Sequence, residues 1–96
     1  MPATITVKKI SDGPYTFEVT VSETNGSTRH AVTMSDATWK SLAKGQGTLE
    51  QCIEASFRFL LDNEPKEAIL SRFDVMVITR YFPNFASELP GYLSRL

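Results

Sequence analysis

Residues 15–34 read YTFEVTVSETNGSTRHAVTM, and the alternation of apolar and polar side chains in this stretch decides the fold. Near its centre lies Asn25-Gly26, and both residue types tolerate the positive φ angles of a type I′ turn. A two-residue loop at this point predicts an antiparallel hairpin with one apolar face and one polar face. On the apolar face, the expected partners are Val21 with His30, Val19 with Val32, and Phe17 with Met34.

A second turn is predicted at residues 11–14, where Ser-Asp-Gly-Pro precedes the stretch quoted above. We expect a three-residue loop here, with Gly13 in the left-handed conformation. The two turns together predict a three-stranded antiparallel meander over about residues 4–10, 15–23 and 28–34. Across the first turn, the expected partners are Val7 with Phe17, Ile5 with Val19, and Lys9 with Tyr15.

The two outer strands of this meander differ in how well they resist pairing with another chain. Lys8 and Lys9 lie on the strand at residues 4–10, and charged side chains on an edge discourage strand addition. The strand at residues 28–34 carries only Arg29 and His30, both near one end. We therefore expect a monomer or a weak homodimer, with any edge-to-edge dimer forming along residues 28–34.

Helical signals begin after the third strand. Ser35 is a typical N-cap for a short helix over residues 36–44, which the Gly45-Gln46-Gly47 segment would end. Thr48 and Gln51 match a capping box and predict a long central helix over about residues 48–62. Apolar residues occupy so much of its circumference that we expect it to be packed on two sides, by the sheet and by the C-terminal third.

The C-terminal third is less regular. Pro65 favours a helix over residues 66–73. Residues 75–79 are compatible with a short buried strand or with a helix started by Asp74, and we prefer the helix. A further short helix is expected over residues 85–96, interrupted at Pro90-Gly91. The sequence thus predicts an α+β fold in one domain, residues 1–96, with the meander followed by four or five helices.

The aromatic and aliphatic residues near the C-terminus exceed what a frayed end would carry. We expect Tyr81, Phe82 and Phe85 to cover the second side of the long helix, meeting Phe57 or Phe59. Beyond Pro90-Gly91 a short tail could separate from the domain. Its apolar residues are candidates for binding a partner protein, namely Tyr92, Leu93 and Leu96.

Composition narrows the function classes. The chain has 96 residues, 42% of them hydrophobic and 22% charged, with a formal net charge of −1. This lack of basic excess makes a nucleic-acid partner unlikely on charge alone. No apolar run approaches the ~20 residues of a membrane-spanning helix, and the N-terminus lacks a signal-peptide core. We expect a cytoplasmic protein without a membrane partner.

Catalytic and metal-binding patterns are not recognisable in the sequence. Cys52 is the only cysteine and His30 the only histidine, so an intrachain disulfide is excluded and a zinc site is not expected. His30 is predicted to be a partly exposed residue at the end of the sheet, and Cys52 falls on the apolar face of the long helix. No spacing supplies a nucleophile, a base and an orienting group together. We expect that the protein is not an enzyme and that it has no catalytic residue and no cofactor.

Other candidate groups have simpler structural interpretations. Glu50 with Glu54 and Glu64 with Glu67 lie near helix starts, where carboxylates complement the helix dipole; Glu54 can also reach Arg58. Residues 45–48 could bind an anion through backbone N–H groups, but an ordinary helix junction is favoured. Trp39 is expected to pack in the core rather than face a partner.

Two resemblances to known families accompany these patterns. The first is to a group of small bacterial proteins of unknown function, covers about residues 28–85, and implies a bacterial, cytoplasmic origin without a function. The segments that carry it are Phe57-Arg58-Phe59-Leu60-Leu61, Glu64-Pro65-Lys66-Glu67, Ile69-Leu70, Phe73 and Arg80-Tyr81-Phe82-Pro83.

The second resemblance covers residues 28–62, where a strand, a short helix, Gly47-Thr48 and a longer helix are similar to the ribbon-helix-helix repressors of antitoxins. These proteins lay a two-stranded ribbon from two chains into the major groove of DNA. The resemblance implies that Arg29, Ala31 and Thr33 face the bases and that Thr48 contacts a phosphate. A DNA-binding regulator is therefore the alternative to our main expectation, a non-enzymatic interaction or regulatory module.

Overall fold

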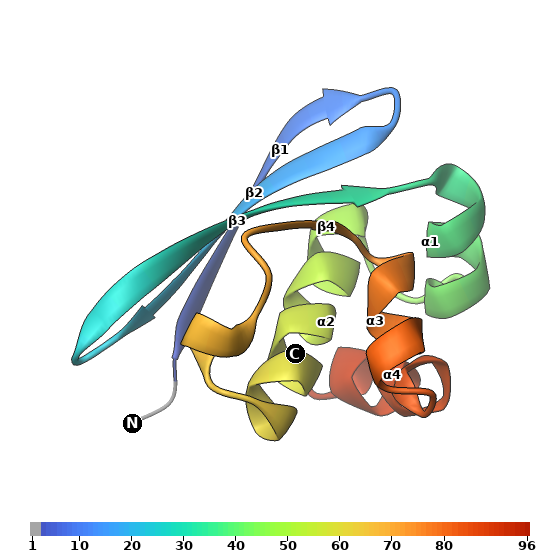
Figure 1. Ribbon diagram of the computed structural model, residues 1–96. Coiled ribbons are helices and arrows are strands. Elements are labelled where there is room, and N and C mark those ends of the chain that lie inside the picture. The colour runs from blue at the N-terminus through green and yellow to red at the C-terminus, as the bar shows by residue number, and fades with distance from the viewer. Residues whose placement is uncertain (1–2) are drawn as a thin grey trace.

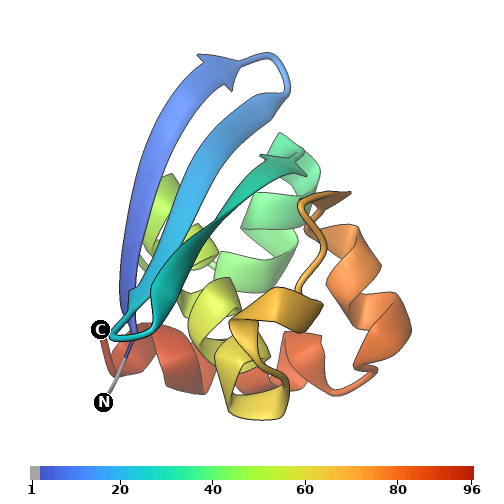
Figure 2. The same cartoon turned by 60° about the vertical axis from the view of Figure 1, so that its left-hand side comes forward.

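The computed structural model describes residues 3–96 as two layers, a twisted sheet and a layer of helices packed against one of its faces (Figure 1). After a turn of the view, all helices still lie on the same side of the sheet, and the other face is open to solvent (Figure 2). The strands lie side by side in the order β1-β2-β3-β4, with β4 parallel to β3 and the other pairs antiparallel. Their bounds are β1 Thr4–Asp12, β2 Tyr15–Glu23, β3 Gly26–Met34 and β4 Arg72–Asp74.

The helical layer confirms the expected α+β class, with a three-stranded antiparallel meander followed by helices of which one is long. Within residues 3–96, none of these helices has the length and apolar character needed to cross a membrane. The bounds are α1 Asp36–Ala43, α2 Leu49–Asn63, a 3₁₀ turn η1 Lys66–Ala68, α3 Met76–Tyr81 and α4 Phe85–Ser94.

The hairpin of β2 and β3 forms as expected, but its pairing is shifted by two residues. The loop is Thr24-Asn25, with Glu23 opposite Gly26, and Val19 lies opposite His30 instead of Val32. This register pairs every residue of β2, whereas the predicted one would place the start of β2 against residues that begin α1. Because side chains alternate with a period of two, the shift leaves every residue on its predicted face.

The first hairpin shows a similar two-residue shift. Gly13-Pro14 forms the turn, with a cis peptide bond, and Gly13 does not take the left-handed conformation predicted for it. The register changes at Ile10, where one extra residue is accommodated in β1 as a bulge. Ile5 and Val7, before the bulge, pack on the core, whereas Ile10 at the bulge is 59% exposed. The observed partners are Ile5 with Val21, Val7 with Val19, Lys9 with Phe17 and Asp12 with Tyr15.

Both predicted helix caps after the meander are confirmed. The Ser35 hydroxyl accepts a hydrogen bond from the Thr38 N–H at 3.0 Å. Thr48 accepts from the Gln51 N–H at 3.1 Å, and the Gln51 side chain accepts from the Thr48 N–H at 2.8 Å. Lys44, with a φ of 52°, ends α1 in the left-handed conformation.

The central helix α2 is packed on two sides, as its broad apolar surface indicates. Towards the sheet, the Phe57 ring lies 5.3 Å from the His30 ring and 5.9 Å from the Phe73 ring, centre to centre. On the other side Phe59 is surrounded by aromatic rings of the C-terminal third. These rings, at centre distances of 5.2 to 5.7 Å, are Phe82, Phe85 and Tyr92.

The segment that follows α2, residues 65–75, differs most from the prediction, and we call it the connecting segment. Instead of a helix over residues 66–73, it forms the single turn η1 and then extends into β4. The extended backbone is held by hydrogen bonds from β3: the Ala31 N–H donates to Ser71 O at 2.8 Å, and the Val75 N–H donates to Thr33 O at 2.9 Å. The edge of β3 that was expected to be free for a dimer is therefore covered by β4 over residues 31–33.

The last two helices confirm one expectation and correct two. Helix α3 begins at Met76 with Val75 at the N-cap position, so the helical alternative for residues 75–79 is correct from Met76 onward. Asp74, the last residue of β4, accepts a hydrogen bond from the Met76 N–H at 3.0 Å. Tyr81, however, is 69% exposed instead of covering α2. Helix α4 also continues through Pro90, because Leu89 and Leu93 on either side of it are both buried in the core.

Candidate functional site

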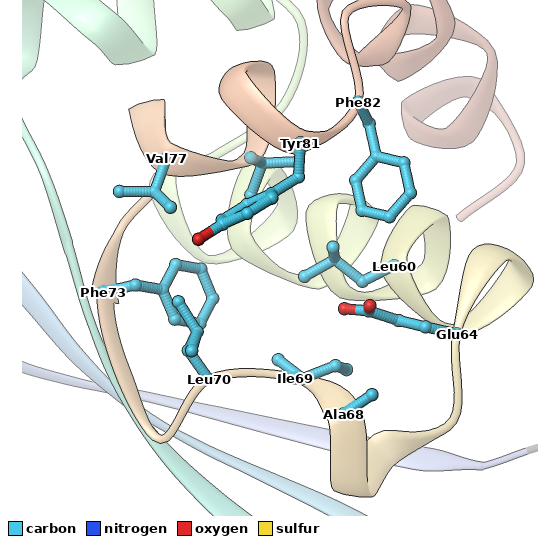
Figure 3. Close-up of a pocket in the computed structure, with 10 residues that line it drawn as sticks. Leu60, Glu64, Ala68, Ile69, Leu70, Phe73, Val77, Tyr81 and Phe82 are labelled. Carbon is cyan, nitrogen blue, oxygen red and sulfur yellow. The ribbon is translucent and has the colours of Figure 1, made fainter.

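An open apolar pocket of about 400 Å³ lies between the last turn of α2, the connecting segment and α3 (Figure 3). Leu60 forms its floor from α2, Ile69 and Phe73 come from the connecting segment, and Val77 and Ile78 come from α3. Ile69 and Phe73 are buried beneath the pocket, with 6% and 9% exposure. The remaining lining residues are Glu64, Ala68, Leu70, Tyr81 and Phe82.

The rim of the pocket exposes large apolar side chains to solvent. Leu70 is 48% exposed on one side, and Tyr81 extends across the other side with its ring over the pocket (Figure 3). Exposed large apolar groups that gather around a concavity are typical of a binding site.

One wall of the pocket is fixed by Lys66, a lysine that is only 2% exposed. Its ammonium lies 2.8 Å from the Glu23 carboxylate and 2.7 Å from the Glu67 carboxylate, and it donates to the Asn25 side-chain oxygen at 3.1 Å. The hydrogen bond to Glu23, followed by that to Glu67, raises the pKa of Lys66 above its ordinary value. Lys66 thus attaches η1 to the turn between β2 and β3.

The same wall is fixed a second time by His30. Its Nδ1 lies 2.7 Å from the carbonyl oxygen of Leu70, and its Nε2 lies 2.8 Å from the Thr28 hydroxyl. A carbonyl oxygen can only accept, so Nδ1 carries the proton that joins the two groups. His30 is 3% exposed, and the prediction of a partly exposed residue is wrong because the connecting segment covers this part of β3.

The electrostatics of the pocket depend on Glu64, the only charged residue among its lining residues. Glu64 caps the C-terminus of α2, and its carboxylate extends into the pocket between Leu60 and Ile69 (Figure 3). Among residues 3–96, it makes neither an ion pair nor a side-chain hydrogen bond. The pocket is therefore apolar with one unneutralised negative charge.

The lining residues include no serine, cysteine, histidine or lysine. The titratable side chains among them are Glu64 and Tyr81. Across the described part of the chain, no three histidine, cysteine, aspartate or glutamate residues are grouped so as to hold a metal ion.

The three tail residues predicted as partner contacts do not line the pocket. Leu93 is buried at 9% exposure, whereas Leu96 is 47% exposed. Tyr92 is half-buried, packs on Phe59 and donates its hydroxyl to Asp62. The end of α4 is thus attached to α2 and does not separate as a free tail, because the helix continues through Pro90.

The residues expected to contact DNA lie on the sheet and at the start of α2. Arg29 is exposed on the outer face of β3, where Ala31 and Thr33 are half-buried. Thr33 donates its hydroxyl to Asp74 at 2.7 Å, and Thr48 is engaged in its capping box. Two of the four candidate groups therefore already have partners within the fold.

The remaining candidates have structural roles. Cys52 is fully buried with its sulfur 3.8 Å from that of Met34, and burial raises the pKa of its thiol to about 11, which confirms a core residue. A Cβ atom on Gly47 would lie 2.6 Å from the Gln51 side-chain oxygen, so this glycine serves the helix junction. Glu54 pairs with Arg58 at 3.6 Å, and half-buried Trp39 packs on the core with its indole N–H unpartnered.

Sequence reasoning did not identify the pocket. It predicted that Tyr81 covers α2 and that residues 66–73 form a helix, and both predictions are wrong. Phe82 does pack on Phe59 as expected, while also lining the pocket. Comparison of the chain with family models, curated proteins and solved structures finds no match.

Proposed function

We propose that this protein is a non-enzymatic interaction module that binds apolar side chains of a partner protein in the pocket between α2, the connecting segment and α3. The observation that carries the proposal is the exposure of Leu70 and Tyr81 around an apolar concavity. Its volume of about 400 Å³ fits one or a few large side chains, which is the size of an anchor at the centre of a protein interface.

Photo-crosslinking in cells of the native host tests this proposal. A photoreactive amino acid at position 81 is expected to yield covalent adducts with a partner protein, identified by mass spectrometry. The matched control carries the same group at position 18, on the outer face of β2, where Glu18 is exposed. Adducts that form equally at both positions, or at neither, would contradict the proposal.

The second candidate is the DNA-binding regulator suggested by the ribbon-helix-helix resemblance. Support comes from the polar outer face of β3, where Arg29 is exposed. Against it, a ribbon shared by two chains needs a free edge on β3, whereas β2 pairs along one edge and β4 covers residues 31–33 of the other. A mobility shift with duplex DNA decides between the two, since tight binding that weakens steeply with salt would favour the regulator.

A further inference from the structure

The charges around the pocket do not balance. Three glutamates lie in this region: Glu64 at the end of α2, Glu67 in η1 and Glu23 at the end of β2. Lys66 neutralises two of them, Glu23 and Glu67. The third, Glu64, is left with no cation. Lys66 cannot serve it as well, because its ammonium is buried on the side of η1 that faces the β2–β3 turn.

The arginine of α2, Arg58, also has other partners. Arg58 donates to the carbonyl oxygen of Ala3 at 2.8 Å and pairs with Glu54 at 3.6 Å. Hydrogen bonds between oppositely charged groups are stronger than those between neutral groups, so an incoming cation can gain from the Glu64 carboxylate. The site therefore offers an apolar surface together with a negative group whose counter-charge is missing within residues 3–96.

Resting on the proposed function, we infer that the occupant of the pocket is a partner segment in which a large apolar side chain is accompanied by a lysine or arginine. The apolar side chain fills the space above Leu60 and Ile69, and the cation pairs with Glu64. On one face of a helix, residues three or four apart have Cβ atoms about 5–6 Å apart, which suits such a pair of side chains. Glu64 is then the residue that selects among apolar partners.

Selection from a random peptide library on the immobilised protein tests this inference. Peptides that also bind a Leu70→Asp variant are removed, since that substitution disrupts the pocket at an exposed position. Wild-type protein is expected to enrich apolar residues next to lysine or arginine, and Glu64→Lys is expected to enrich aspartate or glutamate in their place. The matched control is Glu88→Lys, which reverses an exposed charge on α4 and should select the same peptides as wild type.

The affinities of the wild-type and variant proteins for one selected peptide make the test quantitative. We expect Glu64→Gln to weaken binding about tenfold, which corresponds to roughly 1.4 kcal/mol, while Glu88→Gln leaves it unchanged. If wild type and Glu64→Lys select the same peptides, the charge inference is wrong and the proposed function stands. If no peptide depends on Leu70, the proposed function itself fails.

Self-association would place a second copy of this chain in the pocket, and sedimentation velocity measures such self-association. The inference requires that the isolated protein does not associate through the pocket. Concentration-dependent association that Glu64→Lys abolishes would assign the pocket to self-assembly and overturn the inference.

Discussion

The meander of residues 4–34 and the connecting segment of residues 65–75 are both parts of one sheet, yet they are stabilised in different ways. The meander is a continuous ladder of backbone pairs with an apolar inner face. The connecting segment has one 3₁₀ turn and three residues of parallel pairing. Individual polar groups hold it in place: Lys66 at its start, the Leu70 carbonyl bound by His30 in the middle, and Asp74 at its end.

In this domain an extensively paired scaffold is combined with a pocket wall that has few backbone pairs. A pattern repeated over many residues tolerates the loss of any single polar contact. The connecting segment has fewer backbone pairs and depends more on single polar contacts, together with the burial of Ile69, Phe73 and Val75. Because the connecting segment forms one wall of the pocket, changes in its anchors are expected to alter binding before they alter global stability.

The largest effect is expected from a charge placed on the inner face of the meander. Val19 is fully buried and Thr20 is directed to the outer face of the same strand. Val19→Asp should destabilise the domain by more than about 5 kcal/mol, since it buries an unpaired carboxylate, whereas Thr20→Asp should cost less than about 1 kcal/mol. Urea denaturation followed by circular dichroism measures both, and equal midpoints would show that the two faces are assigned incorrectly.

The next largest effect distinguishes the closed part of the helical layer from the part that lines the pocket. Phe85 is fully buried, whereas Phe82 is half-buried at the pocket wall. Phe85→Ala should lower the free energy of unfolding by about 3–5 kcal/mol, and Phe82→Ala by only about 1–2 kcal/mol.

Deletion of residues 90–96 belongs to the same comparison. It removes buried Leu93 and the contact of Tyr92 with Phe59, and should cost more stability than Phe82→Ala. If the truncated chain matches wild type in thermal unfolding, the end of α4 is not part of the core.

A smaller and local effect is expected from Lys66→Met. Hydrogen exchange should accelerate at the amides of Ala68 and Ile69, whose hydrogen bonds form η1, while the amide of Val19 keeps its protection. Protection that is lost equally at all three amides would show that the connecting segment and the meander open together.

The pH dependence of stability is a second measure of the contribution of Lys66. Lys66 lowers the pKa of Glu67 below its ordinary value of 4.5, so this contribution to stability is present above that pH and is lost as the pH falls. The pKa of Lys66 is raised, so its contribution is complete below 10.5 and is lost at more alkaline pH. As the pH is lowered from about 7 to about 3, the urea midpoint should therefore fall less steeply for Lys66→Met than for wild type.

The smallest effect concerns Cys52, beneath the well-packed centre of the meander. Because burial raises its thiol pKa to about 11, the reactive thiolate is scarce at neutral pH and is shielded from reagents. Alkylation by iodoacetamide should be undetectable in the native protein and rapid in urea. Fast labelling under native conditions would indicate that α2 separates readily from the sheet.

The sequence was informative where a short-range pattern determines the structure. Alternation fixed the faces of Phe17, Val19 and Val21, but it could not fix which residues pair, because a shift by two leaves the faces unchanged. Local capping by Ser35 and Thr48 located two helix starts correctly. These features need only a few neighbouring residues to be specified.

Long-range pairing was not accessible in this way. Residues 72–74 form a strand because β3 supplies their hydrogen-bonding partners. The sequence of residues 65–75 alone does not predict this strand. The same pairing buries His30 and leaves Tyr81 exposed, so the candidate site was missed as a consequence of one unforeseen strand. The one available signal was that residues 57–85 contain more large apolar side chains than two short helices can bury.

The parallel pairing of β3 with β4 also affects the order in which parts of the fold form. Thr33 and Asp74, which hydrogen-bond at the end of this pair, are 41 residues apart in the chain, and closing so long an interval costs more conformational entropy than forming either hairpin. Contacts of this kind form late in folding and slow it. During synthesis the residues of the meander and α2 emerge from the ribosome before Asp74, so the parallel pair can close only after both hairpins are available.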